Sequence, residues 1–115
     1  MPQLTLITNR QANTEDATSL RTQLSMNLAK WLNKPESFCM ITTQFGAEMS
    51  FGGSDELTAH VDISSLGLQE EILPELTQSV CSFLEKSLQI DPARVYVTFS
   101  SPPRTHWGWN GKTFG

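Results

Sequence analysis

Hydrophobic and polar residues alternate, or β-forming residues cluster, in four short segments of the chain. These segments are residues 3–8, 38–45, 58–64 and 94–100. A period of two is typical of a β-strand that buries one face, and Ile, Val, Thr and aromatic residues favour strands. The pattern therefore predicts four strands, the second of which runs through FCMITTQF.

Two longer segments instead carry apolar residues at spacings of three and four, which place them on one face of a helix. The first set is Ala17, Leu20, Leu24, Leu28 and Trp31, and the second is Leu76, Val80, Phe83, Leu84 and Leu88. Asn13 and Thr14 both suit the N-cap of the first helix, and Asn33-Lys34-Pro35 suits its end. The second helix starts either near Leu68 or near Pro74, since proline is favourable only in a first helical turn.

The elements follow the order strand–helix–strand, twice. A right-handed crossover through each helix brings the two strands of a unit into a parallel arrangement. We therefore predict a single α/β (α+β) domain over residues 1–115, with a four-stranded mixed sheet and two helices on one face. The duplication is one of pattern only, because the residues of the two halves differ.

The two predicted faces of this sheet differ in polarity. The face expected to receive the helices carries Leu4, Leu6, Phe38, Met40, Val61, Ile63, Val95, Val97 and Phe99. The opposite face carries Thr5, Ile7, Cys39, Ile41, His60, Asp62, Ser64, Tyr96 and Thr98. This second face is too polar for a core under helices and too apolar to be left bare in water. Further copies of the chain would cover it, so the sequence predicts a homo-oligomer.

Composition and charge argue against several classes of partner. The net charge is −4 and the 8 basic residues are scattered singly, so the basic stripe that binds nucleic acid is missing. No apolar run reaches the roughly 18–20 residues that span a bilayer, and no basic start precedes an apolar segment. We therefore expect a cytoplasmic protein without nucleic-acid or membrane partners. Cys39 and Cys81 lack a C-x-x-C spacing and are predicted to be reduced, buried thiols.

Several motifs have both a structural and a chemical interpretation. FGGS at 51–54 lacks the spacing of a phosphate-binding loop and predicts a tight turn. His60 and His106 have no partner at metal-ligand spacing, so we expect no metal site. Lys34 suits the negative end of the first helix. The tail SPPRTHWGWNGKTFG predicts a short hairpin, whose aromatic residues either fill the edge of the core or form a wall for a small ligand.

The first predicted strand begins with proline, because Pro2 directly follows Met1. Proline contributes no ladder hydrogen bond, and the first residue of a strand is one of the places that tolerate it. Pro2 is also small enough for removal of Met1 to be expected. The chain would then begin with a free secondary amine, a group able to carry protons in catalysis.

Six short motifs occur in the same order as in one known family. They are Met1-Pro2, Lys34-Pro35, Phe51-Gly52-Gly53-Ser54, Ser65-Leu66-Gly67, Pro92-x-Arg94-Val95-Tyr96, and Gly108-Trp109-Asn110 with Thr113-Phe114. Each motif alone is weak, but all six in order, in a chain of this length, are specific. Over essentially its whole length the sequence resembles the macrophage migration inhibitory factor family of the tautomerase superfamily.

The resemblance implies a homotrimer in which three four-stranded sheets enclose a channel and active sites lie between subunits. It also implies keto–enol tautomerase activity toward small aromatic α-keto acids such as phenylpyruvate, without cofactor or metal. Pro2 would be the general base, since burial and the Lys34 ammonium both favour a neutral amine. Lys34 would also bind the substrate carboxylate or the developing enolate. The resemblance assigns substrate binding to Ser65, Leu66, Phe38, Tyr96, Thr98, Trp107, Trp109 and Phe114.

Three departures from the family pattern bear on this expected site. Thr98 stands where vertebrate members have asparagine, Phe38 replaces a tyrosine, and Trp107 replaces a smaller residue, so we expect a narrower and more apolar pocket. Two alternatives stay open. One is a cytokine-like module that binds a cell-surface receptor, exported without a signal peptide, with weak tautomerase activity. The other is a relative with decarboxylase- or dehalogenase-like chemistry, which usually adds arginines to the site, yet neither Arg94 nor the other arginines lie at a telling position.

Overall fold

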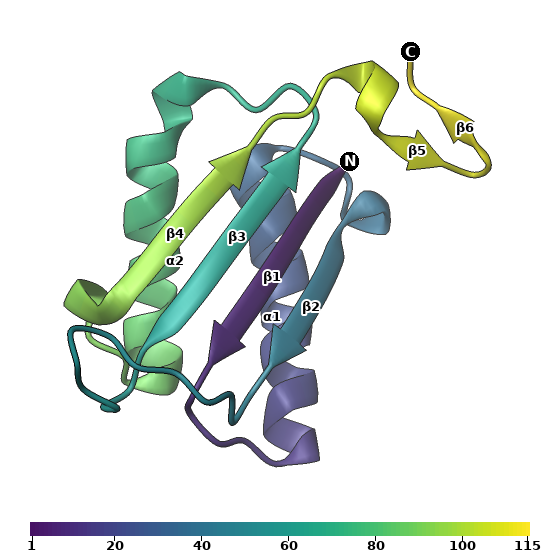
Figure 1. Cartoon of the computed structure of the whole chain (residues 1–115). Helices are drawn as coiled ribbons and strands as arrows, with labels where there is room; N and C mark the ends of the chain where they lie inside the picture. Colours follow the sequence, from purple (N-terminus) through teal and green to yellow (C-terminus); the bar gives the residue numbers. More distant parts are fainter.

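The four predicted strands form one sheet, and both helices lie on one of its faces, in the computed structural model of residues 1–115 (Figure 1). The elements are β1 (Pro2–Thr8), α1 (Thr14–Leu32), β2 (Met40–Gln44), β3 (Ala59–Ser65), α2 (Leu73–Leu88), β4 (Val95–Ser100), β5 (Gly108–Trp109) and β6 (Lys112–Thr113). The predicted α+β architecture with a four-stranded mixed sheet is confirmed. Neither helix has the length and apolar character needed to cross a membrane.

The strand order β2-β1-β3-β4 shows how the two halves of the chain meet. β1 and β2 are parallel, β3 and β4 are parallel, and the central pair β1 and β3 is antiparallel. Each strand–helix–strand unit therefore has the predicted parallel strands, and the two units join through their first strands. This arrangement makes β1 a central strand of the sheet, and the N-terminus lies where β1 begins (Figure 1).

The core lies between the sheet and the two helices. Side chains that are at most 2% exposed come from both layers, with Leu4, Leu6, Val61 and Ile63 from the sheet and Leu24, Leu28, Val80 and Leu84 from the helices. Each fully buried side chain of this kind contributes about 1.5–3 kcal/mol of transfer free energy. The helical faces predicted from the apolar spacing are therefore the faces that pack on the sheet.

The start of the second strand differs from the prediction. β2 begins at Met40 rather than at residue 38, because Glu36–Phe38 forms a single 3-10 turn after Pro35. Proline fixes its own backbone angle and suits the residue before such a turn. Phe38 therefore leaves the sheet and becomes part of the connection between α1 and β2.

The face assignment in β2 was also wrong. Ile41 pairs with Leu4 in the β1–β2 register, so it lies on the helix side and packs against the core, as does Cys39. Met40 points to the open face and is 61% exposed, whereas Phe38 and Met40 had been expected under the helices. Residues 38–41 are all apolar, so the sequence does not show which of them face the helices. The hydrogen-bond register with β1 determines this.

The ends of the helices follow the capping signals in the sequence. The Asn13 side chain accepts a hydrogen bond from the Asp16 backbone N–H at 2.8 Å, which makes it the N-cap of α1. Asn33 ends the helix in the left-handed conformation, with a φ of 52°. α2 begins at Leu73 with Pro74 in its first turn, so the second of the two starting points left open by the sequence is the correct one.

We expect Asn13→Ala to lower the free energy of unfolding by about 1 kcal/mol, because the Asp16 backbone N–H then loses its hydrogen-bond acceptor. The measurement is urea unfolding followed by circular dichroism. Thr14→Ala is the matched control, since Thr14 is the first helical residue and does not cap. Equal destabilisation by the two substitutions would contradict the assignment of Asn13 as the cap.

The two cysteines are free thiols. Both are half-buried rather than buried, so the predicted degree of burial was wrong. Cys39 packs against the core from the position just before β2, and Cys81 lies on α2.

Candidate active site

Three parts of the chain meet at the end of the sheet where β1 begins. Pro2 pairs with Ser65 across the β1–β3 ladder, and both residues are fully buried. Lys34 follows the end of α1, where its backbone N–H donates to the carbonyl of Ala29 at 2.9 Å. Lys34, Ser65 and Leu66 line one cavity of about 250 Å³. The structure therefore brings together four of the residues predicted for the site.

The electrostatics of this end of the sheet favour a neutral amine. Burial lowers the pKa of the Met1 amino group below its ordinary value, and the nearby Lys34 ammonium lowers it further, while Cys39 acts in the opposite direction. Burial, and then Glu36, raise the pKa of the Cys39 thiol, so the neutral thiol is favoured. An amine placed here gives up its proton at a lower pH than an exposed amine would.

The aromatic residues of the C-terminal tail gather beside this end rather than in the core. β5 and β6 form the predicted hairpin, which extends away from the sheet near the N-terminus (Figure 1). Trp109 is 52% exposed and meets the Phe38 ring edge-on, with ring centroids 5.6 Å apart. Phe114 stacks on Trp109 with centroids 6.4 Å apart. Of the two interpretations of the tail, filling the edge of the core was wrong, and the wall for a small ligand, formed by Phe38, Trp109 and Phe114, stays a prediction.

Trp107 is joined to this aromatic wall through its backbone carbonyl, which accepts a hydrogen bond from the Phe114 N–H at 3.1 Å. It lines a shallow hollow of about 320 Å³ together with Gln3 and Ser64. Those two residues neighbour Pro2 and Ser65 in sequence, and strand alternation turns them to the open face of the sheet. Trp107 therefore approaches the same end of the sheet from the side opposite the helices.

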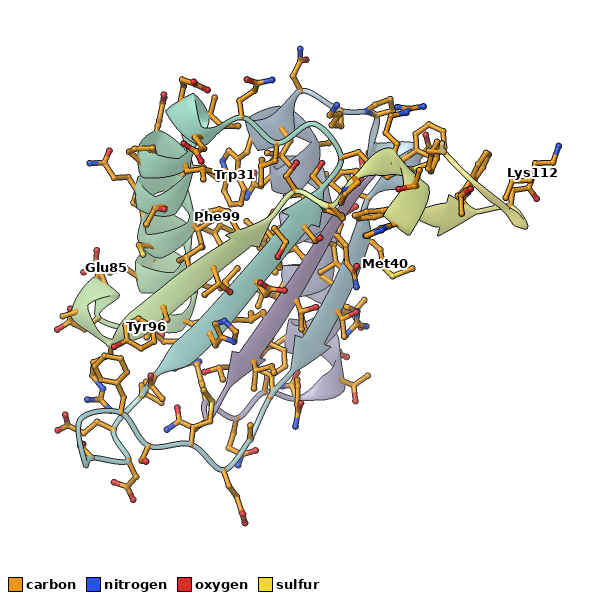
Figure 2. All side chains as sticks on the ribbon, turned by 45° about the horizontal axis from the view of Figure 1, so that its top comes forward. Trp31, Met40, Glu85, Tyr96, Phe99 and Lys112 are labelled. Atoms are coloured by element: carbon orange, nitrogen blue, oxygen red, sulfur yellow. The ribbon has the colours of Figure 1, made fainter.

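Tyr96 and Thr98 are the two predicted site residues that a single chain does not bring to Pro2. Tyr96 pairs with His60, which pairs with Ile7, five residues along β1 from Pro2. At about 3.4 Å per residue this separation is about 17 Å along the sheet, and for Thr98 it is about 10 Å. Figure 2 shows Tyr96 and Met40 at opposite ends of the sheet.

The hydroxyl of Thr98 is already engaged within its own chain. It donates to Asp62 Oδ1 at 2.7 Å and lies 2.9 Å from His60 Nε2. A hydroxyl has one hydrogen, so Thr98 gives that hydrogen to Asp62 and accepts from His60. His60 therefore has a hydrogen-bond partner within the sheet. Sequence reasoning missed the contact with Asp62, although a period of two places Asp62, His60 and Thr98 on one face.

Phe51 and Arg94 lie beside Tyr96, at the end of the sheet away from Pro2, and sequence reasoning did not predict this contact. Phe51 and Ser54 close the predicted tight turn, in which Gly52 and Gly53 have φ angles of +60° and +77°. The Phe51 ring lies against Tyr96, with ring centroids 5.0 Å apart. Phe51 belongs to the FGGS motif, and Arg94 and Tyr96 belong to the motif Pro92-x-Arg94-Val95-Tyr96. Only the fold shows that these two motifs are in contact.

The arrangement suits proton transfer at carbon. A half-buried amino terminus, a nearby ammonium and an aromatic wall are parts that could move a proton beside a carbonyl bound through an anionic group. No group of three His, Cys, Asp or Glu side chains lies close enough together to hold a metal ion.

Comparisons with known proteins agree over the whole chain. The family model described as "Macrophage migration inhibitory factor (MIF)" matches residues 1–115. A macrophage migration inhibitory factor of Xenopus tropicalis is 32% identical over 115 residues, which is 99% of each chain. A macrophage migration inhibitory factor homolog of Brugia malayi is 31% identical over 116 residues, which is 100% of each chain. A solved structure of a homologue from Prochlorococcus marinus has a TM-score of 0.91 at 38% identity, covering 98% of this chain and 99% of that chain.

Proposed function

The chain belongs to the macrophage migration inhibitory factor family, and we propose that it is a cofactor-independent keto–enol tautomerase whose general base is the amine of Pro2. The observation that supports this proposal most is the meeting of Pro2, Lys34 and Leu66 at one end of the sheet. The substrate class is a small aromatic α-keto acid, with phenylpyruvate as the model compound. Its carboxylate suits Lys34, and its ring suits the wall of Phe38, Trp109 and Phe114.

The proposed reaction moves one proton between carbon and oxygen. After removal of Met1, the neutral Pro2 nitrogen takes a proton from the carbon beside the ketone. The electron pair of that C–H bond forms the C=C bond of an enolate, and the carbonyl oxygen gains negative charge. The protonated amine then returns the proton to this oxygen, which gives the enol; the reverse sequence gives the ketone. Lys34 lowers the barrier by holding the carboxylate or by stabilising the charge that develops on oxygen.

A homotrimer is part of the proposal because one chain holds only part of the site. Tyr96 and Thr98 lie about 17 Å and about 10 Å along the sheet from Pro2, too far to reach a substrate bound there. Both residues are on the open face, which also exposes Met40. A neighbouring copy that covers this face would bring its own Tyr96 and Thr98 to the Pro2 end, so that each site is built from two chains.

Mixing two inactive variants tests a site shared between copies. We expect Pro2→Gly and Tyr96→Glu each to be nearly inactive, the second because a carboxylate repels the anionic substrate. When the two are unfolded and refolded together at equal amounts, each mixed trimer has one site with an intact Pro2 and an intact Tyr96, which makes about a quarter of all the sites formed by random assembly. Turnover of phenylpyruvate should therefore recover to about a quarter of the wild-type rate.

The control for this mixing experiment is the same pair of variants refolded separately and then combined on ice. It should show only the mean of the two low rates. A jointly refolded sample with no more activity than this control would contradict a site shared between chains, provided that native mass spectrometry shows trimers containing both variants.

The rate of conversion of phenylpyruvate enol to ketone tests the proposed activity itself. We expect purified protein, shown by mass to lack Met1, to accelerate this conversion without added metal or cofactor. If a folded and oligomeric protein gave no acceleration, then tautomerase activity toward this substrate class would be rejected, and the receptor-binding alternative would become the leading one.

A further inference from the structure

Arg94 holds the loop between β2 and β3 by several hydrogen bonds at once. Its guanidinium donates to the backbone carbonyls of Leu57 at 2.9 Å, Phe51 at 3.1 Å, Ser54 at 3.2 Å and Glu56 at 3.1 Å. Arginine can do this because its planar head carries five donors in a rigid fork, whereas lysine offers a single ammonium. The loop therefore depends on the guanidinium and not merely on a positive charge.

This loop presents the Phe51 ring in a defined position. Phe51 and Ser54 exchange both backbone hydrogen bonds, at 2.9 and 3.1 Å, around Gly52 and Gly53. Both glycines have positive φ angles, which residues with a Cβ adopt only at a cost in free energy. The Arg94 guanidinium carbon also lies 5.3 Å from the centre of the Phe51 ring, within the range of a cation–π contact.

Phe51 in turn contacts Tyr96, which the open sheet leaves with little other support. The two rings meet at an interplanar angle of 60°, with centroids 5.0 Å apart. Tyr96 is 66% exposed and lies at the end of the sheet next to this loop (Figure 2). A contact of this kind restricts the rotamers of an aromatic side chain that would otherwise be free to move.

We infer that Arg94, acting through Phe51, is a positioning residue that holds the Tyr96 ring in place for the substrate. The inference rests on the proposed function, in which Tyr96 completes the site of a neighbouring copy. It gives a physical reason for two motifs that the chemistry at Pro2 does not use, FGGS at 51–54 and Pro92-x-Arg94-Val95-Tyr96. The ring touches the substrate; Arg94 does not.

The position of the ring can be followed directly, because Tyr96 is the only tyrosine in the chain. Protein labelled with 3-fluorotyrosine should give one ¹⁹F resonance. We expect Phe51→Leu and Arg94→Lys to shift this resonance in the same direction, since both remove the Phe51 ring from its place. Arg21→Lys is the matched control, because Arg21 bonds only to Thr18 and Thr43 on the other side of the molecule, and it should leave the resonance unchanged.

Kinetics with phenylpyruvate test whether the position of the ring matters. An aromatic ring such as that of Tyr96 binds the substrate and the transition state alike, so loosening the ring raises KM and leaves kcat nearly unchanged. We expect KM to rise about three- to tenfold in Phe51→Leu and in Arg94→Lys. Phe51→Tyr keeps an aromatic ring on Tyr96 and should restore a KM close to that of the wild type.

The two measurements separate this inference from the proposed function. An unmoved ¹⁹F resonance in Phe51→Leu, or a moved resonance with an unchanged KM, would overturn the positioning role while tautomerase activity stands. A wild-type protein without turnover would instead overturn the proposed function and, with it, the role of Arg94 and Phe51 in substrate binding. If Arg94→Lys does not fold, Phe51→Leu decides the matter, because it leaves the guanidinium and its carbonyl partners intact.

Discussion

Replacing Pro2 with glycine is expected to lower kcat/KM for phenylpyruvate about 100-fold, which is typical of the loss of a general base. Glycine leaves an amine at the start of the chain and is small enough for Met1 still to be removed. It takes away the pyrrolidine ring, which is buried at the start of β1 and fixes the direction of the nitrogen. A primary amine on a freely rotating residue is both more hydrated and poorly aimed, so the rate should fall although a base is present.

The comparison requires mass spectrometry of each protein to show that Met1 is gone. Gln23→Ala is the control, because Gln23 is exposed on α1, away from the site, and its side chain bonds only to Ser19. It should retain most of the activity. Equal kcat/KM values for wild type and a processed Pro2→Gly protein would remove Pro2 from the mechanism.

The second large effect is expected for Lys34→Met, which removes the cation and keeps the length and apolar character of the side chain. We expect kcat/KM to fall about 100-fold, the typical cost of losing a group that stabilises developing charge. The pH dependence should change as well. Lys34 is the second cause, after burial, of the lowered pKa of the Met1 amino group, and we expect it to act in the same way on the Pro2 amine that removal of Met1 exposes. Its loss raises that pKa, so the neutral amine, and with it the activity, appears only at higher pH.

Lys30→Met is the matched control for this variant. Lys30 lies in the last turn of α1, so the two substitutions remove the same charge from the same end of one helix. Lys30→Met should leave kcat/KM and its pH profile close to those of the wild type. A profile that moves to lower pH in Lys34→Met, or moves equally in both variants, would contradict the role given to the Lys34 ammonium.

The fold could be predicted wherever burial imposes a clear period on the sequence. Leu20, Leu24 and Leu28 show the buried face of α1 because mostly polar residues separate them, and the alternation around Val61 shows the buried face of β3. The phase of β2 could not be predicted. Residues 38–41 are apolar throughout, so only the hydrogen-bond register with β1 determines that Ile41 packs inward and Met40 outward.

The candidate site could be predicted only as a set of residues, because its geometry depends on contacts between distant segments. The sequence does not show that the Thr98 hydroxyl donates a hydrogen bond to Asp62, which lies 36 residues earlier. It also does not show that Arg94, which looked uninformative beside Pro2, reaches back across 43 residues to the carbonyl of Phe51. Such contacts follow from which strands pair and where the loops return, and composition and spacing do not specify either.

The most direct test of the proposed mechanism is the titration of the Pro2 nitrogen by ¹⁵N NMR in protein labelled at proline. The chain has six prolines, and only Pro2 would present a free amine once Met1 is removed. We predict one titrating nitrogen whose pKa lies below the ordinary range of such an amine and coincides with the pH at which kcat/KM rises. An active protein whose Pro2 nitrogen does not titrate, or titrates at a pH unrelated to the rate, would contradict catalysis by the amino-terminal proline.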